Sequence, residues 1–108
     1  MKTYQGNRFE GGNVVTVDDR PLPVRLDLVN HSPTGFEWGY GGSGPAQLAL
    51  AILADHLGPG GENIALDVYQ AFKLEVVAHL ARAGWMLTTA EIDAWIAWWA
   101  AEGKAAAR

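Results

Sequence analysis

The residues best suited to chemistry lie in one glycine-rich stretch, residues 36–48, which reads FEWGYGGSGPAQL. Gly39, Gly41 and Gly44 have the spacing G-x-G-x-x-G. In dinucleotide-binding folds this spacing lets the backbone approach a pyrophosphate at the N-terminus of a helix. The candidate turn for an anion or a small ligand consists of Gly41, Gly42, Ser43 and Gly44.

The context of this motif favours a tight turn before a helix over a phosphate site. A dinucleotide fold needs more parallel strands than a chain of 108 residues leaves room for, and a P-loop would have Gly-Lys-Ser/Thr where Pro45 follows Gly44. Ser43 or Gly44 is predicted to cap the helix, and Gln47 could reach back toward the cap. The remaining glycines would let the chain pass close to another element.

The histidines give no pattern for metal binding or nucleophilic catalysis. His31, His56 and His79 are far apart and lack the spacing of metal ligands. His31, in a loop, is the most exposed candidate, whereas His79 is predicted at the edge of the core. A Ser-His-Asp triad could be drawn from His31 and Asp27 with Ser32 or Ser43, but no G-x-S-x-G elbow supports it. We expect no catalytic residue, no cofactor and no metal site.

Aromatic residues crowd the C-terminal part, where Trp95, Trp98 and Trp99 share one predicted helix. A core-facing stripe at i, i+3, i+4 and i+7 is formed by Ile92, Trp95, Ile96 and Trp99. Trp98 lies off the centre of this stripe. It either packs at the rim of the core against residues 1–44 or anchors a partner, as exposed tryptophans do. The candidate partner-binding residues are His31, Trp38, Tyr40 and Trp98.

The composition argues against several classes of function. The chain has no cysteine, which excludes disulfides and cysteine-ligated zinc and fits a cytoplasmic protein. Its formal net charge is −4 without a basic stripe, which argues against direct nucleic-acid binding. Residues 1–9 are polar, so no signal peptide is expected. No apolar run approaches the roughly 20 residues that span a membrane.

The chain is predicted to form one domain over residues 1–108, with two parts of different composition. The first part, residues 1–44, is rich in Gly, Pro, Asn and Asp and contains the glycine-rich loop. Its short β-branched or alternating runs predict strands at 2–5, 13–17, 24–29 and 36–38.

Residues 45–102 are rich in Ala, Leu and Trp, and they are predicted to form three helices. The first, at 45–57, is apolar on all sides, which is typical of a buried helix. The second, at 63–83, is predicted to end at Gly84 as its C-terminal cap.

The third helix has the clearest start signal. Thr88 and Glu91 form a predicted capping box, and the helix continues to about residue 102 before a frayed tail at 103–108. The predicted fold class is α+β: a small antiparallel β-sheet from the N-terminal 40 residues packed on three α-helices.

Residues 30–50, NHSPTGFEWGYGGSGPAQLAL, resemble a domain-of-unknown-function family known from bacterial chromosomes, plasmids and phages. Segments at 2–6, 15–22, 72–77 and 85–88 extend the resemblance over nearly the whole chain, although Leu74 stands where an aromatic residue would be expected. The resemblance implies no activity, substrate or catalytic residue. It implies a context, because small proteins carried by mobile elements often act on host machinery, including defence systems.

The leading hypothesis is a non-enzymatic protein-binding module carried by a mobile element, in its most specific form an anti-CRISPR-like inhibitor of a host defence complex. It would bind through the loop at 30–40, Trp98 and acidic helix surfaces. Two alternatives stay open. One is a small-ligand or nucleotide-binding protein that uses the turn at 39–44. The other is a self-associating structural module with Trp98 at the seam of a homodimer.

Overall fold

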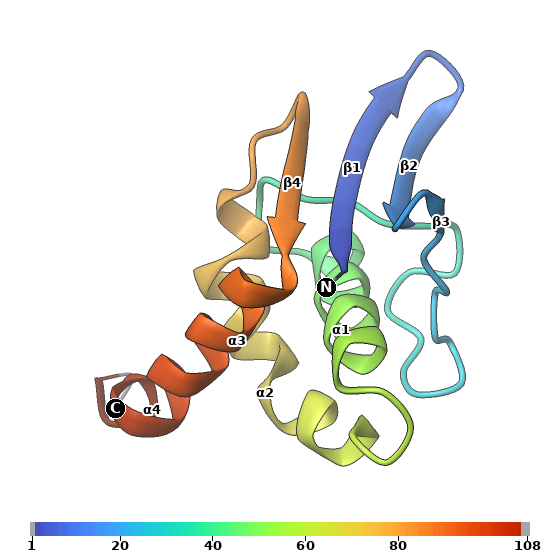
Figure 1. The fold of residues 1–108 in the computed structure, drawn as a ribbon. Helices are drawn as coiled ribbons and strands as arrows, with labels where there is room; N and C mark the ends of the chain where they lie inside the picture. Colours follow the sequence, from blue (N-terminus) through green and yellow to red (C-terminus); the bar gives the residue numbers. More distant parts are fainter. Residues whose placement is uncertain (1, 107–108) are drawn as a thin grey trace.

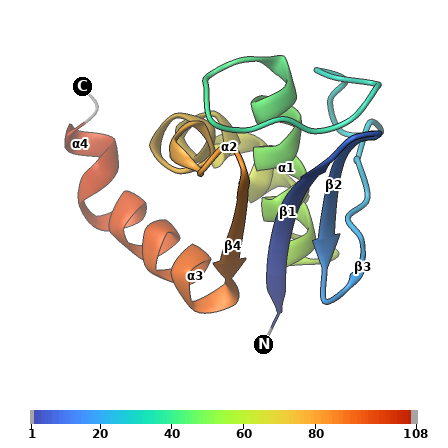
Figure 2. The same cartoon turned by 90° about the horizontal axis from the view of Figure 1, so that it is seen from above.

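In a computed structural model, which describes residues 2–106, a four-stranded antiparallel sheet lies against a layer of helices (Figures 1 and 2). A hairpin joins β1 (Thr3–Phe9) to β2 (Gly12–Val17), and the short β3 (Arg20–Pro21) pairs with the outer side of β2. The fourth strand, β4 (Gly84–Thr88), pairs with β1 from the other end of the sequence. The predicted α+β fold class is confirmed.

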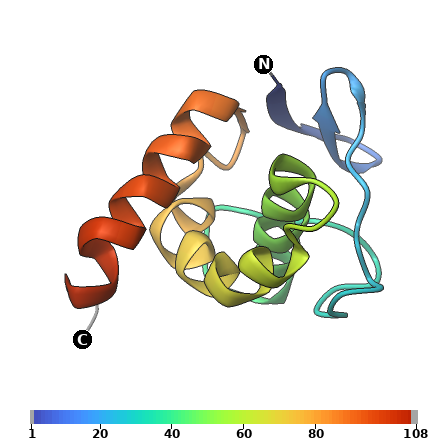
Figure 3. The same ribbon diagram turned by 60° about the horizontal axis from the view of Figure 1, so that its bottom comes forward.

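Two helices follow the long loop after β3, and a third follows β4. They are α1 (Ser43–Leu57), α2 (Glu62–Glu75) with a 3-10 turn after it, and α3 (Thr89–Trp98). A π-helical turn (Trp99–Gly103) and α4 (Lys104–Ala106) continue α3 in one direction. We call residues 89–106 the C-terminal rod. Figure 3 shows α2 between the rod and α1, with the far end of the rod pointing away from the body.

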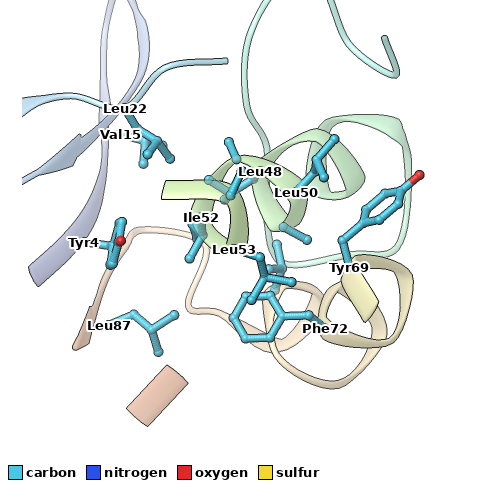
Figure 4. Packing of buried hydrophobic residues seen from close by; sticks show 14 of the residues in the cluster. Tyr4, Val15, Leu22, Leu48, Leu50, Ile52, Leu53, Tyr69, Phe72 and Leu87 are labelled. Carbon is cyan, nitrogen blue, oxygen red and sulfur yellow. The ribbon is translucent and has the colours of Figure 1, made fainter. Parts of the chain in front are cut away.

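The core is built around α1 because its apolar residues occur on every side of the helix. Every residue from Gly44 to Ala54 is buried, as the sequence predicts. Figure 4 shows the large side chains of α1 spreading toward Tyr4 and Leu87 of the sheet on one side and toward Phe72 of α2 on the other. Because α1 is packed on both sides, its N-terminus has a fixed position, and so does the glycine-rich turn that leads into it.

Two predicted strands, at 24–29 and 36–38, are wrong, because both segments belong to the irregular loop between β3 and α1. Arg25 has a φ of 60°, which is incompatible with an extended strand. Its guanidinium bonds the Asp27 carboxylate at 3.0 and 3.1 Å, which closes a local turn. The sheet therefore takes its last strand from Gly84–Thr88 and not from the first 40 residues.

The second helix is shorter than predicted, and Gly84 does not cap it. The helix ends at Glu75, and Gly84 begins β4. β4 places Trp85 over Gly6 of β1, where a Cβ atom on Gly6 would lie 2.2 Å from the indole nitrogen. The pairing of Trp85 with a glycine fixes the register of this strand.

The third helix begins as predicted, with the complete capping box between Thr88 and Glu91. The predicted frayed tail at 103–108 is wrong for residues 103–106, which continue the rod in helical conformation. Residues 107 and 108 lie outside the described part of the chain.

Candidate functional site

The glycine-rich turn is shaped by close packing around the start of α1. The N-cap is Gly42 rather than Ser43 or Gly44, and no side chain bonds the cap. A Cβ on Gly44 would lie 2.6 Å from the Cβ of Glu37, and one on Gly39, which has a φ of 86°, would lie 2.8 Å from the Arg82 side chain. The expectation that these glycines let the chain pass close to another element is confirmed.

An acidic side chain, Glu37, lies against the first turn of α1 at Gly44. Its carboxylate accepts hydrogen bonds from the Arg8 guanidinium at 2.9 and 3.2 Å and from the Asn13 amide at 2.7 Å. The bonds from Arg8 are the main reason that the pKa of Glu37 lies below its ordinary value, and the Asn13 bond adds to the effect. Arg8 is therefore engaged by Glu37 and is not a free positive charge for an anion at this helix end.

A polar cavity of about 210 Å³ adjoins Glu37, but the glycine turn does not line it. The wall consists of Asn13, Ser32, Thr34, Gly35, Phe36 and Glu37. The polar groups of Asn13, Ser32 and Glu37 already bond one another or the neighbouring backbone. The cluster therefore ties β1 and β2 to the loop before α1, and this accounts for its polar composition.

Trp38 is fully buried, so its assignment as a partner-binding residue is wrong. Its indole N–H donates to the carbonyl oxygens of Ala81 and Arg82, both at 3.1 Å. Its ring meets Trp85 edge to face with centroids 5.8 Å apart, and the Arg8 guanidinium lies 4.4 Å from the ring centroid. With its polar atom bonded inside and both ring surfaces covered, Trp38 anchors the loop to the core.

His31 is half-buried and held from two sides, which contradicts its assignment as the most exposed histidine. Its ring Nε2 lies 2.7 Å from the Tyr69 hydroxyl, and its backbone N–H donates to the side chain of Gln47 at 2.8 Å. Gln47 is fully buried and also donates to the carbonyl of Val24 at 2.7 Å. Gln47 therefore fastens the loop at 24–32 to α1 instead of reaching back to the helix cap.

The other two histidines occupy different environments from each other. His79, predicted at the edge of the core, is exposed. His56 lies at the end of α1, where its Nε2 is 2.6 Å from the Asp93 carboxylate of α3. Within residues 2–106 no group of three or more His, Asp or Glu side chains is placed to hold a metal ion.

Sequence reasoning missed a polar cluster that connects β1 with the end of α1. The buried Tyr4 hydroxyl donates to Asp55 at 2.7 Å, and the same carboxylate oxygen accepts from the Lys2 ammonium at 3.1 Å. Burial, and then the bond to Asp55, raise the pKa of Tyr4 far above its ordinary value. No local signal could reveal this cluster, because 51 positions separate Tyr4 from Asp55.

Tyr40 and Trp98 remain exposed, at 44 % and 39 % of their surfaces, but they do not form the single surface that was expected. Tyr40 belongs to the loop before α1, and Trp98 ends α3 in the C-terminal rod. Figure 2 shows the loop before α1 and the C-terminal rod as separate segments, with α2 between them. Any partner that contacts Trp98 therefore meets the rod.

The C-terminal rod packs on the core through one face, which carries Ile92, Trp95 and Ile96. Trp95 meets Phe72 of α2 edge to face at 5.0 Å, and Trp99 stacks on Trp95 at 5.7 Å. Trp98 lies beside Trp99 and Gly103 of its own helix, where a Cβ on Gly103 would be 2.8 Å from the Trp98 ring. Exposed small residues lie before and after Trp98 along the rod: Ala94, Ala97, Ala101 and Ala105.

Over the described residues, no helix combines the length and apolar character needed to cross a membrane. Comparisons with curated proteins and with solved structures gave no match. A family model does match, and it covers residues 4–98, from β1 to the end of α3. This chain therefore belongs to DUF6166, a family of unknown function.

Proposed function

We propose that this chain is a non-enzymatic protein-binding module whose partner docks on the C-terminal rod. One observation carries the proposal. The uninterrupted apolar run AWIAWWAA, at residues 94–101, lies on a helix that packs on the core through one face. A helix that is apolar all round is normally buried all round. Here Trp98 stays 39 % exposed among exposed alanines, which leaves an exposed apolar face with one large aromatic anchor.

The charge of the chain favours a partner with a basic surface. The formal net charge is −4, and the rod itself carries the acids Glu91, Asp93 and Glu102 against one lysine, Lys104. Complexes that hold nucleic acid present basic surfaces, and an acidic protein is steered toward them. This supports the more specific proposal of a cytoplasmic inhibitor or modulator of a host defence complex, carried by a mobile element and similar to an anti-CRISPR.

Quantitative capture from a host lysate tests the binding surface. The immobilised chain is compared with Trp98→Ala, and bound proteins are measured by mass spectrometry. We expect Trp98→Ala to weaken capture of the partner about tenfold or more, because buried tryptophan anchors dominate interface energies. Ile64→Ala is the matched control, since Ile64 is exposed to 52 % in the first turn of α2 and does not belong to the rod. Circular dichroism verifies that each variant is folded.

Tyr40→Ala decides whether the partner docks at Tyr40 or at Trp98. Because Tyr40 lies in the loop before α1, its removal should leave capture unchanged. Loss of capture with Tyr40→Ala, together with normal capture by Trp98→Ala, would move the docking site to the loop and overturn the proposed surface.

A plating assay tests the defence role separately from binding. Cells with an active CRISPR-type system are challenged with a targeted phage while they express the chain or Trp98→Ala. We expect the wild-type chain to raise the plating efficiency and the variant to fail. If the chain captures a partner but never changes plating on any tested system, the binding module stands and the defence role is rejected.

The alternative of a nucleotide or phosphate at residues 39–44 has no comparable support. The Glu37 side chain fills the space beside Gly44 at this helix end, and the turn contributes nothing to the wall of the adjoining cavity. A thermal-shift screen with nucleotides and phosphate is the direct comparison. Stabilisation that Gly41→Val abolishes in a folded protein would favour this alternative.

A further inference from the structure

Two small hollows adjoin at the end of α1, on either side of the ion pair between Lys2 and Asp55. The first has a volume of about 240 Å³, and we call it the Arg20 hollow. It is lined by Lys2, Val17, Arg20, Pro21, Pro23 and Asp55. The second, of about 220 Å³, extends toward the start of α2 and includes Arg25 and Glu62 in its wall.

Of the basic side chains in the walls of these hollows, Lys2 and Arg25 have acidic partners, whereas Arg20 has none among the described residues. Asp55 accepts hydrogen bonds from Lys2 and from the buried Tyr4 hydroxyl through one oxygen. Arg25 is engaged by Asp27 and lies 3.7 Å from Glu62. Within the described residues Arg20 forms no ion pair, so the Arg20 hollow has an uncompensated positive charge on a protein whose net charge is −4.

The remaining wall of the Arg20 hollow is apolar. Val17 is buried with its side chain toward the core side of the sheet, and Pro21 and Pro23 close the hollow from β3 and the loop after it. Proline rings are rigid, so Pro21 and Pro23 lose little conformational entropy when a ligand binds. Arg20 pairs with Val17 across β3 and β2, so the two side chains lie on the same face of the sheet. The hollow thus places a guanidinium beside a small apolar surface.

We propose that the Arg20 hollow binds a small monocarboxylate with an apolar body. A planar guanidinium and a carboxylate form two parallel hydrogen bonds, with the Lys2 ammonium as a second positive group on the same wall. The apolar body would cover Val17, Pro21 and Pro23. A phosphate dianion is disfavoured because Asp55 belongs to the same wall, and a cation is disfavoured by Arg20 and Lys2. None of the residues in the wall of this site belongs to the proposed docking surface around Trp98, and the site does not depend on the proposed protein-binding function.

Butyrate and butyramide are the matched probes, since they have nearly the same shape and differ in charge. Binding is followed by two-dimensional NMR titration of the full chain. We expect butyrate to shift the signals of Val17, of the Arg20 side chain and of neighbouring residues, and butyramide to leave them unchanged. Arg20→Gln should weaken butyrate binding about tenfold or more. Arg82→Gln, which removes another exposed arginine without an ion pair among residues 2–106, should bind as the wild type does.

Three results would overturn the site. They are equal shifts with butyramide, unchanged affinity in Arg20→Gln, and butyrate-induced shifts that map away from Val17 and Arg20. The wild-type titration decides the question even if Arg20→Gln does not fold. Trp98→Ala should bind butyrate normally, so failure here leaves the protein-binding proposal intact, and the reverse also holds.

Discussion

At the scale of single residues, the glycines of the motif differ in what surrounds them. A Cβ on Gly44 would lie 2.6 Å from the Glu37 side chain in a filled space. We therefore expect Gly44→Ala to lower the free energy of unfolding by about 1–3 kcal/mol, the usual cost of overpacking. Urea unfolding followed by tryptophan fluorescence measures this loss.

Gly41→Ala is the control for that substitution. The nearest atom to a Cβ on Gly41 is a methyl group of Leu74 at 3.8 Å, an ordinary contact, and its φ is not positive. The variant should be unchanged or stabilised by up to about 1 kcal/mol, because alanine restricts the unfolded chain. Equal losses at both positions would contradict the close-packing explanation of the motif.

The bonds from Arg8 to Glu37 predict a pH dependence of stability. Because they lower the pKa of Glu37 in the folded state, the unfolded chain takes up this proton at higher pH. The stabilisation is present above the ordinary pKa of 4.5 and is lost as the pH falls through the lower, folded pKa. As the pH is lowered from 4.5, we expect the urea midpoint of the wild type to decrease more steeply than the urea midpoint of Glu37→Gln.

The comparison of Glu37→Gln with Glu10→Gln isolates this effect. Glu10 is exposed, and none of the described residues bonds its side chain, so its substitution should leave the pH profile of the wild type nearly unchanged. Parallel profiles for Glu37→Gln and the wild type would show that the Arg8–Glu37 pair does not contribute to acid sensitivity. The exposure of both partners keeps the expected difference small.

At the scale of elements, the junction of β4 and α3 depends on one residue. Thr88 pairs with Thr3 in the sheet and also accepts the Glu91 N–H at 3.2 Å as the N-cap of α3. We expect Thr88→Ala to cost about 1 kcal/mol, and Thr88→Ser to cost much less, because serine retains the capping oxygen. Urea unfolding measures both variants. Equal losses would mean that the methyl group of Thr88 and not the cap supports the junction.

Elements with local signals could be predicted from the sequence, and those defined by distant partners could not. The end of α1 and the start of α3 follow from a glycine stop and a capping box, which involve neighbouring residues. β4 escapes such reasoning because its identity comes from pairing with β1 at the other end of the chain. Without that pairing, Gly84 is an ordinary signal for the end of a helix.

The candidate residues divide in the same way. The sequence shows which aromatic side chains are present, but whether each one points into the core or toward solvent depends on packing that no local pattern contains. Trp38 points inward because carbonyl groups at 81 and 82 can accept its N–H, and His31 is held by Tyr69. Trp98 stays outside because Ile92, Trp95 and Ile96 occupy the core-facing side of the rod.

At the scale of the whole molecule, the shape separates a packed body from a projecting rod. The principal extents are 41 × 27 × 27 Å, and Figures 1 and 3 show the rod leading away from the other helices. α1 is buried from Gly44 to Ala54, whereas residues 100–105 are exposed apart from Gly103. Local opening costs least where few buried contacts must break. The far end of the rod should therefore open without unfolding of the body.

Hydrogen exchange tests this difference along the chain. We expect amides in the middle of α1 to exchange only through global unfolding, and those of residues 101–106 to exchange at least about 100-fold faster through local opening. Equal protection of the two segments in a free monomer would contradict the division into body and rod. If a protein partner docks around Trp98, its binding should slow exchange in the rod far more than in α1, which is already protected. This selective slowing would connect the projecting shape of the rod with its proposed role, because a helix that lacks contacts on one face gains them from the partner.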